Sequence, residues 1–283
     1  MKKHICIVDG SGFMHRARGI AKPMYRSDGQ DIGVTNLFAK MIRKVVRRAN
    51  QGNIPPTHWA MAFDPPREDS WRRKVHAGYK AHRESPEQSF VDQIPLMQEC
   101  CRGAGFPVIK TPRHEADDVL AAYALDAHEQ DYKVTLITSD KDLMQLVRPG
   151  ILLWDARADA WFKTDDVTNK FGVPPERLAD YLALAGDVAD GIPGAKGIGP
   201  KAAVGILGKG HTLEEVVKNP ELIENKRWRT LVENNNEELL LAARLVALDA
   251  EECPRPYSLD ELAVERTDLL EECVSLWMKE NLT

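Results

Sequence analysis

Short, largely apolar runs alternate with amphipathic segments along the first 160 residues of the chain. Runs this short and continuous are typical of strands that are buried on both faces of a sheet. Helical patterns fill the gaps between them, including one that begins near Thr35. Strands that alternate with helices predict an α/β fold, with a central, mostly parallel sheet flanked by helices. The predicted strands cover residues 5–8, 58–63, 107–109, 134–138 and 151–154.

Carboxylates follow several of these predicted strands. Asp9 and Asp64 stand directly after the first and second strands, and Asp140 and Asp142 follow the fourth. Ligands of open parallel sheets bind beyond the C-terminal ends of the strands. We therefore expect these acids to converge at one edge of the sheet.

The third strand leads into an acidic helix start at residues 115–118. A helix dipole favours anions at the N-terminus, so an acidic first turn is ordinary by itself. Acids that also converge from other strands would repel one another unless cations lay between them, and oxygen ligands suit Mg²⁺ or Mn²⁺. We predict two ions about 4 Å apart, as in phosphodiester hydrolysis. The inner cluster would hold Asp9, Asp64, Glu115 and Asp117, and the outer cluster Asp118, Asp140 and Asp142.

A basic segment occupies residues 65–100, between the second and third strands. Its bases are Arg67, Arg72, Arg73, Lys74, Lys80 and Arg83, interleaved with Trp71, His76, Tyr79 and His82. This composition suits a nucleic-acid strand through phosphate pairing and base stacking. A solvated basic helix is the alternative.

The second half of the chain is organised differently. Glycines and Pro200 in residues 182–206 predict a hairpin that opens a helix. Backbone N–H groups of such a hairpin could bind phosphate without reading sequence, although a plain helix–helix turn is an alternative. We therefore expect an α/β core over residues 1–175, with the basic segment as an arch, and a helical region over residues 176–283.

Six motifs in chain order resemble those of the 5′-nuclease (flap endonuclease) superfamily, and in particular the N-terminal domain of bacterial DNA polymerase I and its free-standing phage and bacterial relatives. The resemblance implies a nuclease core related to the PIN and resolvase folds, a helical arch and a helix–three-turn–helix. The chain ends at Thr283 without a polymerase segment, so we expect a stand-alone nuclease. The motifs lie at residues 8–11, 63–64, 71–83, 115–118, 138–143 and 186–201.

This resemblance implies 5′-3′ exonuclease and flap endonuclease activity by two-metal-ion catalysis near single-strand/double-strand junctions. It adds Asp187 and Asp190 to the seven metal ligands already named. It also implies that Lys80 and Arg83 contact the scissile phosphate, so that the expected catalytic set is Lys80, Arg83, Asp9, Asp64 and Asp117. The residues expected at DNA are Arg72, Tyr79, Lys80, Arg83, Thr35, Gly197, Gly199 and Lys201.

The expected substrate is 5′-flap, nicked or branched duplex DNA, with RNA primers as a further candidate. In the family a K⁺ ion often lies at the hairpin, and we expect a monomer. One departure concerns Gly191, which stands where Asn is usual and could loosen the turn that holds Asp190.

Composition and charge agree with this interpretation. The chain has 283 residues, 43% hydrophobic and 29% charged, and a net charge of −5. Without the nine predicted metal ligands, 38 basic residues face 34 acidic ones, which leaves a mildly basic remainder. Five cysteines without C-x-x-C spacing indicate neither disulfides nor zinc. No run resembles a signal peptide or a membrane span, so we expect a cytoplasmic protein.

Two other functions remain as alternatives. The first is a non-catalytic protein that binds DNA junctions on the same fold, although binding alone would not favour retaining so many repelling acids. The second is a nucleotide-binding enzyme that uses Gly10 and Gly12. Asp9 opposes this second function, because a carboxylate beside a pyrophosphate repels it unless a metal intervenes.

Overall fold

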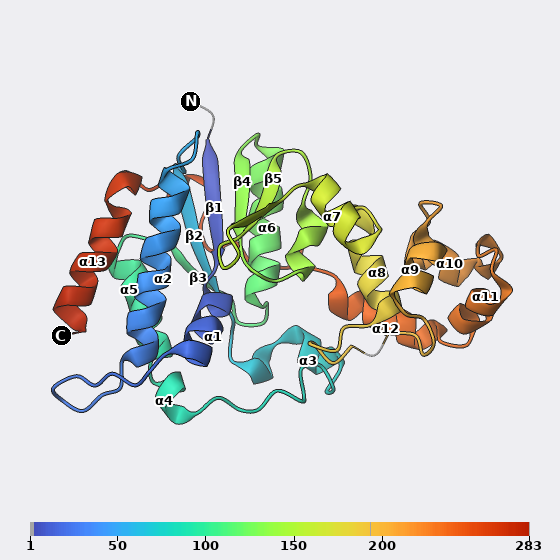
Figure 1. Cartoon of the computed structure of the whole chain (residues 1–283), viewed down its shortest axis with the longest axis horizontal. Coiled ribbons are helices and arrows are strands. Elements are labelled where there is room, and N and C mark those ends of the chain that lie inside the picture. Colours follow the sequence, from blue (N-terminus) through green and yellow to red (C-terminus); the bar gives the residue numbers. More distant parts are fainter. Residues whose placement is uncertain (1–2, 193, 283) are drawn as a thin grey trace.

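The computed structural model describes residues 3–192 and 194–282, and it confirms the predicted fold class. Six strands form one sheet in the order β3-β2-β1-β4-β5-β6 (Figure 1). The first five run parallel and the last is antiparallel at the edge. The strands are β1 (His4–Asp9), β2 (His58–Phe63), β3 (Val108–Lys110), β4 (Lys133–Ile137), β5 (Ile151–Asp155) and β6 (Ala160–Phe162).

Helices cover both faces of this sheet. One face packs against α1 (Gly10–Ile20), α2 (Gly33–Asn50), α5 (Ile94–Gly103) and α13 (Leu270–Asn281). The other face packs against α6 (Ala116–Glu129), whose buried surface includes five alanines. That second core continues into the helical region at the right of Figure 1. The region contains α7 (Thr164–Phe171), α8 (Leu178–Ala185), α9 (Pro200–Leu207), α10 (Leu213–Lys218), α11 (Lys226–Glu233) and α12 (Asn236–Val246).

The order of the strands creates a crevice at the centre of the sheet. Strand β1 lies between β2 and β4, so the chain crosses from one half of the sheet to the other after β3. Val8 pairs with Met61 on one side and with Ile137 on the other. The residues that follow these three strands therefore emerge side by side, at the point where α/β sheets bind ligands.

The predicted strands match β1 to β5 closely, whereas β6 was not predicted. Strand β6 has three residues, none of them fully buried, and pairs only with β5. Such a short edge strand carries little periodic signal.

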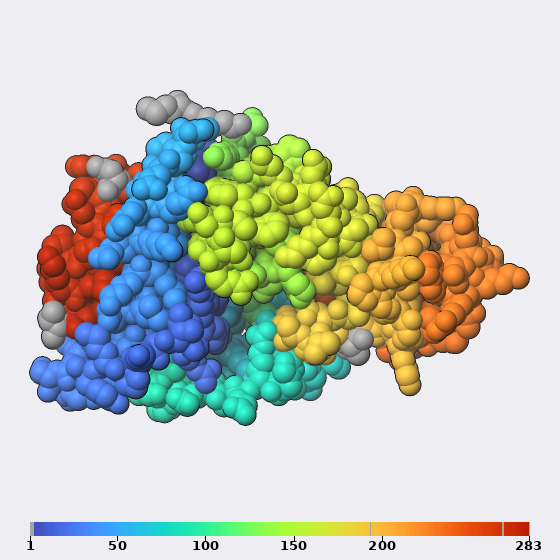
Figure 2. Space-filling model, in the orientation of Figure 1, coloured from blue at the N-terminus to red at the C-terminus, as the bar shows by residue number. Residues whose placement is uncertain are grey.

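The basic segment crosses the C-terminal edge of the sheet as a strap, with two short helices, α3 (Trp71–Val75) and α4 (Gln88–Val91). Turns and extended backbone join the two helices over residues 76–87. Figure 1 shows the strap below the sheet, and Figure 2 shows that it forms part of the lower edge of this face of the molecule.

The expected boundary near residue 175 falls at a turn of 3₁₀ helix, Pro175–Arg177. The last helix, α13, nevertheless returns to the sheet layer and packs against α2 and α5. Within residues 3–192 and 194–282, no helix is both long and apolar enough to cross a membrane.

Candidate active site

Asp9 and Asp64 lie at the central crevice, each fixed by local hydrogen bonds. Asp9 accepts hydrogen bonds from the Gly12 amide at 2.7 Å and from the Thr138 hydroxyl at 2.9 Å. Asp64 accepts one from the Ala116 amide at 2.8 Å, which ties the end of β2 to the start of α6. The two strand ends and the acidic helix start therefore meet, as the sequence predicted.

Four carboxyl groups of this site are electrostatically destabilised in their charged form. Burial raises the pKa of Asp9 to about 7, and the negative charge of Asp64 contributes to the same shift. Burial and the charge of Asp140 likewise raise the pKa of Asp142 to about 7. Burial also raises the pKa values of Asp117 and Asp140. Carboxylates packed in this way favour a bound cation.

Glu115 has a different environment, because basic groups surround it. Its Oε2 atom lies 3.3 Å from Arg72 Nη1 and 3.3 Å from Lys80 Nζ, and it accepts a hydrogen bond from the Tyr79 hydroxyl at 2.9 Å. Burial alone would raise the pKa of Glu115, but Lys80 and Arg72 outweigh burial and hold the pKa below its usual range.

Asp187 and Asp190 come from a tight turn between α8 and α9. Two hydrogen bonds between the backbones of Asp187 and Ile192, at 2.7 and 2.8 Å, close this turn. Gly191 occupies it with φ of +72°. The turn thus brings both acids to the crevice from the helical region. Asp187 and Asp190 are the two acids that were expected from the family resemblance alone. Pro193, part of the same motif, lies outside the described residues.

The strap packs directly onto that turn and onto the acids. The Lys80 amide donates a 2.8 Å hydrogen bond to the Asp190 carbonyl, with Lys80 at φ of +51°. Lys80 Nζ lies 3.6 Å from Asp190 Oδ2, and Arg83 donates to Asp190 Oδ1 at 2.7 Å. Burial opposes a charge on Lys80, but Glu115 and the other acids raise its pKa well above the ordinary value. In this conformation Lys80 and Arg83 therefore pair with Glu115 and Asp190.

Lys141 is a third basic group at the site, and the sequence reasoning assigned it no role. Its ammonium bonds to Asp187 and lies 3.4 Å from Asp142 Oδ1. Its role could have been predicted from its position between two acids in the run Asp140-Lys141-Asp142, which brings a positive charge to the same strand end.

Two residues, one predicted to bind DNA and one predicted to bind metal, are instead buried and fully engaged. Arg72 was predicted at DNA, but it is 2% exposed and bonds to Asp118, to Glu115 and to two backbone carbonyls. Asp118 was predicted in the outer metal cluster, but it is 0% exposed. Its two oxygens accept hydrogen bonds from Arg72, Trp71 and two backbone amides. Arg72 and Asp118 therefore pair with each other in this conformation, and their roles at DNA and metal stay predictions.

Two other residues predicted at DNA are also buried, and their roles there stay predictions. Thr35 is 0% exposed, and its amide and hydroxyl both donate to Gln93 Oε1. Tyr79 is 2% exposed, with its hydroxyl on Glu115 and Asp190, so its ring is unavailable for base stacking. Tyr79 thus holds the strap against the acids, and Thr35 ties the start of α2 to Gln93.

The predicted hairpin has the exposure that a phosphate site needs. Gly197, Gly199 and Lys201 are exposed, and α9 begins directly after Gly199. A Cβ atom built on Gly199 would meet nothing within 4 Å, so the start of α9 is open to a ligand. The DNA role of these three residues stays a prediction.

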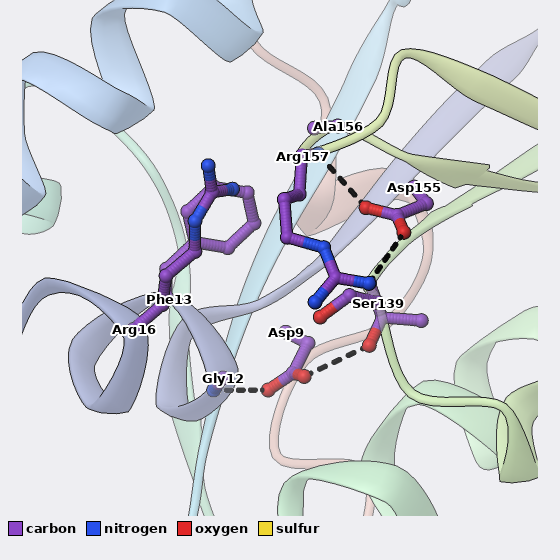
Figure 3. Close-up of a pocket in the computed structure, with 9 residues that line it drawn as sticks. Asp9, Gly12, Phe13, Arg16, Ser139, Asp155, Ala156 and Arg157 are labelled. Atoms are coloured by element: carbon purple, nitrogen blue, oxygen red, sulfur yellow. Dashed lines mark hydrogen bonds and ion pairs between the residues drawn. The ribbon is translucent and has the colours of Figure 1, made fainter. Parts of the chain in front are cut away.

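A small pocket beside Asp9 adds two basic residues that the sequence reasoning missed (Figure 3). Its lining includes Arg16 and Arg157, the latter bonded to the buried Asp155 at 3.4 Å. Arg16 is half-buried and has no ion pair or hydrogen bond among the described parts of the chain. Arg16 follows Asp9 by seven residues, or two helical turns, and this spacing could have placed Arg16 near Asp9 from the sequence.

The acidic side chains are of the type that binds divalent cations, but in this structure they are not arranged as a metal site. Within the described ranges, no three acidic, histidine or cysteine side chains already stand together as a ready metal site. The basic side chains of the strap lie among the acids instead. Among the described residues, Asp142 Oδ1 is nonetheless buried without a hydrogen-bond partner, although Lys141 Nζ lies 3.4 Å away. Burial raises the pKa values of four carboxyl groups here, which favours a bound cation.

Comparison with known proteins agrees with the arrangement of the site. Two family models match the chain: one described as 5′-3′ exonuclease, N-terminal resolvase-like domain, over residues 4–172, and one described as 5′-3′ exonuclease, C-terminal SAM fold, over residues 173–269. The chain is 37% identical to DNA polymerase I of Rhizobium leguminosarum over 270 residues, which are 94% of this chain and 26% of that protein. It is 33% identical to a 5′-3′ exonuclease of Aquifex aeolicus, with 94% of this chain and 89% of that protein covered.

Solved structures share the fold over nearly the whole chain. The T5 D15 protein, co-crystallised with metal ions, matches with a TM-score of 0.71 and 19% identity, covering 98% of this chain and 99% of that chain. The catalytic core of Rad2 in complex with DNA substrate matches with a TM-score of 0.54 and 16% identity, covering 99% and 87%. The chain spans about a quarter of the length of the Rhizobium polymerase, so the activities of that whole protein are not transferred to it.

Proposed function

Because the chain belongs to the 5′-3′ exonuclease family, we propose that it is a metal-dependent 5′ nuclease that cuts DNA near single-strand/double-strand junctions. The observation that carries this proposal is the meeting of acids from three strand ends, one helix start and one turn beneath a basic strap. A protein that only bound DNA would gain nothing from so much buried negative charge.

The proposed metal ligands are eight of the nine predicted acids, because Asp118 is committed to Arg72. Two divalent ions bound there would supply Lewis-acid chemistry, activating water and stabilising the leaving oxygen. We take Mg²⁺ as the ion, with Mn²⁺ as a substitute. The proposed ligands are Asp9, Asp64, Glu115, Asp117, Asp140, Asp142, Asp187 and Asp190.

Lys80 and Arg83 are proposed to bind the scissile phosphate. Both now pair with Glu115 or Asp190, and Arg83 remains half-exposed with a side-chain exposure of 48%. A phosphate that enters the crevice offers these cations an anionic partner in exchange for the carboxylates. Arg16 lies beside Asp9 and has no ion pair within the described part of the chain, so it is well located to hold a neighbouring phosphate of the same strand.

Several finer features of the substrate belong to the same proposal. The hairpin before α9 would bind the duplex through its backbone amides, with K⁺ at the turn, and the relatives T5 D15 and Rad2 are described with DNA. We propose 5′-flap, nicked or branched DNA as the main substrate and RNA primers as a second one. We also propose that the protein acts as a monomer in the cytoplasm, where such DNA is processed.

The test is cleavage of a 5′-end-labelled flap duplex with Mg²⁺ and with EDTA. We expect short labelled products with Mg²⁺ alone, and none from Asp117→Asn, which removes one carboxylate and retains its shape. A duplex with a 3′ flap is the matched substrate control. DNA that is retarded on a gel but uncut under both conditions would refute catalysis and favour a junction-binding protein.

A further inference from the structure

Arg72 makes an unusually complete set of contacts for a residue of the basic strap. Its guanidinium binds Asp118 in a fork, with Nη1–Oδ2 at 2.8 Å and Nη2–Oδ1 at 2.7 Å. Nε donates to the Leu245 carbonyl at 2.9 Å and Nη2 to the Ala247 carbonyl at 2.8 Å. Nη1 also lies 3.3 Å from Glu115 Oε2. We call Arg72, Asp118 and the two carbonyls the arginine clamp.

The arginine clamp joins three parts of the chain that are distant in sequence. Arg72 belongs to α3 of the strap, Asp118 to the first turn of α6, and the two carbonyls to the C-terminal end of α12. The last turn of a helix has carbonyls without helical partners, so an arginine there is favourable. Helix α12 in turn packs against α8, which leads into the turn that bears Asp187 and Asp190. The clamp therefore sets where the acidic helix start stands relative to that turn.

The geometry at Glu115 distinguishes Arg72 from its basic neighbours. Arg72, Tyr79 and Lys80 all approach the same oxygen, Oε2, which turns Oε1 away from the three donors. Lys80 can exchange Glu115 for a phosphate, since it is a mobile point charge on a long stem. Arg72 cannot exchange, because its other hydrogen bonds fix the guanidinium. It is the cation that remains at Oε2 when the strap engages a substrate.

We propose that Arg72 is a positioning residue that holds Glu115 in place for divalent-ion binding and takes no part in binding DNA. This inference rests on the proposed function, because it assigns Glu115 as a metal ligand. Residues that orient metal ligands from outside the coordination sphere typically contribute 10- to 100-fold to metal affinity or activity. An effect of that size is expected here, without loss of DNA affinity.

The chain offers a matched control at the other end of the same helix. Arg255 binds Asp126 of α6 in a fork, at 2.9 and 3.0 Å, and also donates to the carbonyls of Glu251 and Cys253. It thus repeats the chemistry of the arginine clamp on α6, far from the acids in sequence. Arg255→Lys should cost stability without changing the metal site.

The experiment compares wild type, Arg72→Lys and Arg255→Lys in three measurements. Calorimetric titration of the DNA-free protein with Mn²⁺ gives metal affinity, flap-duplex binding in EDTA gives the Kd for DNA, and single-turnover cleavage over a Mg²⁺ series gives the rate. For Arg72→Lys we expect about 10- to 100-fold weaker Mn²⁺ binding or slower cleavage. We expect an unchanged Kd for DNA and an unchanged salt dependence of that Kd. Arg255→Lys should match wild type in all three.

Several outcomes would overturn the proposal. Equal Mn²⁺ affinity and equal rate in Arg72→Lys and wild type would do so, as would the same loss in Arg255→Lys, which would indicate general destabilisation. Weaker DNA binding, together with a slope of log affinity against log salt concentration that is smaller by about one, would mean that Arg72 contacts phosphate instead. If Arg72→Lys does not fold, Asp118→Asn weakens the clamp by removing the charge of the carboxylate that binds Arg72, and the same three measurements are made on that variant. A wild type that binds Mn²⁺ but cleaves no flap would refute the proposed function alone, because the Mn²⁺ comparison still decides the role of Arg72.

Discussion

Neutralising Asp9 should stabilise the metal-free protein at neutral pH, although Asp9 is a proposed metal ligand. Burial raises the pKa of Asp9 from 3.8 to about 7. The folded state therefore binds this proton more tightly than the unfolded state does. Stability from this group is present at low pH and is lost as pH rises through the window from about 4 to 7.

The size of the effect follows from the shift. About three pKa units at about 1.4 kcal/mol each give about 4 kcal/mol of destabilisation at pH 8. Asn cannot accept both hydrogen bonds that Asp9 accepts from Gly12 and Thr138, and losing one costs about 1 kcal/mol. Asp9→Asn should therefore raise the free energy of unfolding in EDTA by about 2–3 kcal/mol at pH 8, and should lose this advantage near pH 4.

Urea unfolding in EDTA between pH 4 and 8 measures this directly. Asp155→Asn is the matched control, since Asp155 is also a buried acid at a strand end, but it accepts hydrogen bonds from the Arg157 and Ala158 amides and pairs with Arg157. That control should destabilise the fold. An Asp9→Asn variant that is less stable than wild type at pH 8 would refute the electrostatic account of the site. With saturating Mg²⁺ the order should reverse, because only wild type retains the full ligand set.

Three further predictions test other parts of the molecule. Asp117→Asn should lower flap cleavage at least about 100-fold while the Kd for DNA in EDTA stays unchanged, and unimpaired cleavage would exclude Asp117 from the metal ligands. Lys80→Ala should slow cleavage and reduce the salt slope of DNA binding by about one, as filter binding over a NaCl series can show; an unchanged slope would mean that Lys80 contacts no phosphate. Gly191→Asn, which installs the residue usual in the family, should lower the urea unfolding free energy by about 1–3 kcal/mol. The reasons are that Gly191 has φ of +72° and that a Cβ atom there would lie 2.9 Å from the Gly78 carbonyl; a stabilised variant would contradict this.

The sheet and the position of its acids could be predicted because both depend on local pattern. Buried parallel strands read as continuous apolar runs, and Asp9 and Asp64 stand directly after two of them. The general rule that ligands bind beyond the C-terminal strand ends then brings them together. The hydrogen bond from the Ala116 amide to Asp64 shows that the end of β2 and the acidic start of α6 do meet.

The fate of individual charged residues could not be predicted in the same way. Arg72 and Lys80 look equivalent in the sequence, yet one is buried on carbonyls of residues 245 and 247 and the other faces the crevice. Only the packing of α12, more than 170 residues later, separates them. The burial of Asp118 and Thr35 could not be predicted either, since their partners Arg72 and Gln93 are distant in sequence.

The alanine-rich surface of α6 gives the two arginine forks another meaning. Helix α6 buries Ala116, Ala121, Ala122, Ala124 and Ala127 beside larger side chains such as Leu120 and Tyr123, so small side chains form much of its packed surface. Arg72 pins its first turn and Arg255 its last, each through a fork with a defined direction. Each end of α6 is therefore held by an arginine fork, which opposes sliding and rotation of the helix. Arg72 itself belongs to α3 of the strap, so the clamp fixes α3 and the acidic first turn of α6 relative to each other, and adjustment to an incoming strand falls to the irregular backbone of residues 76–87.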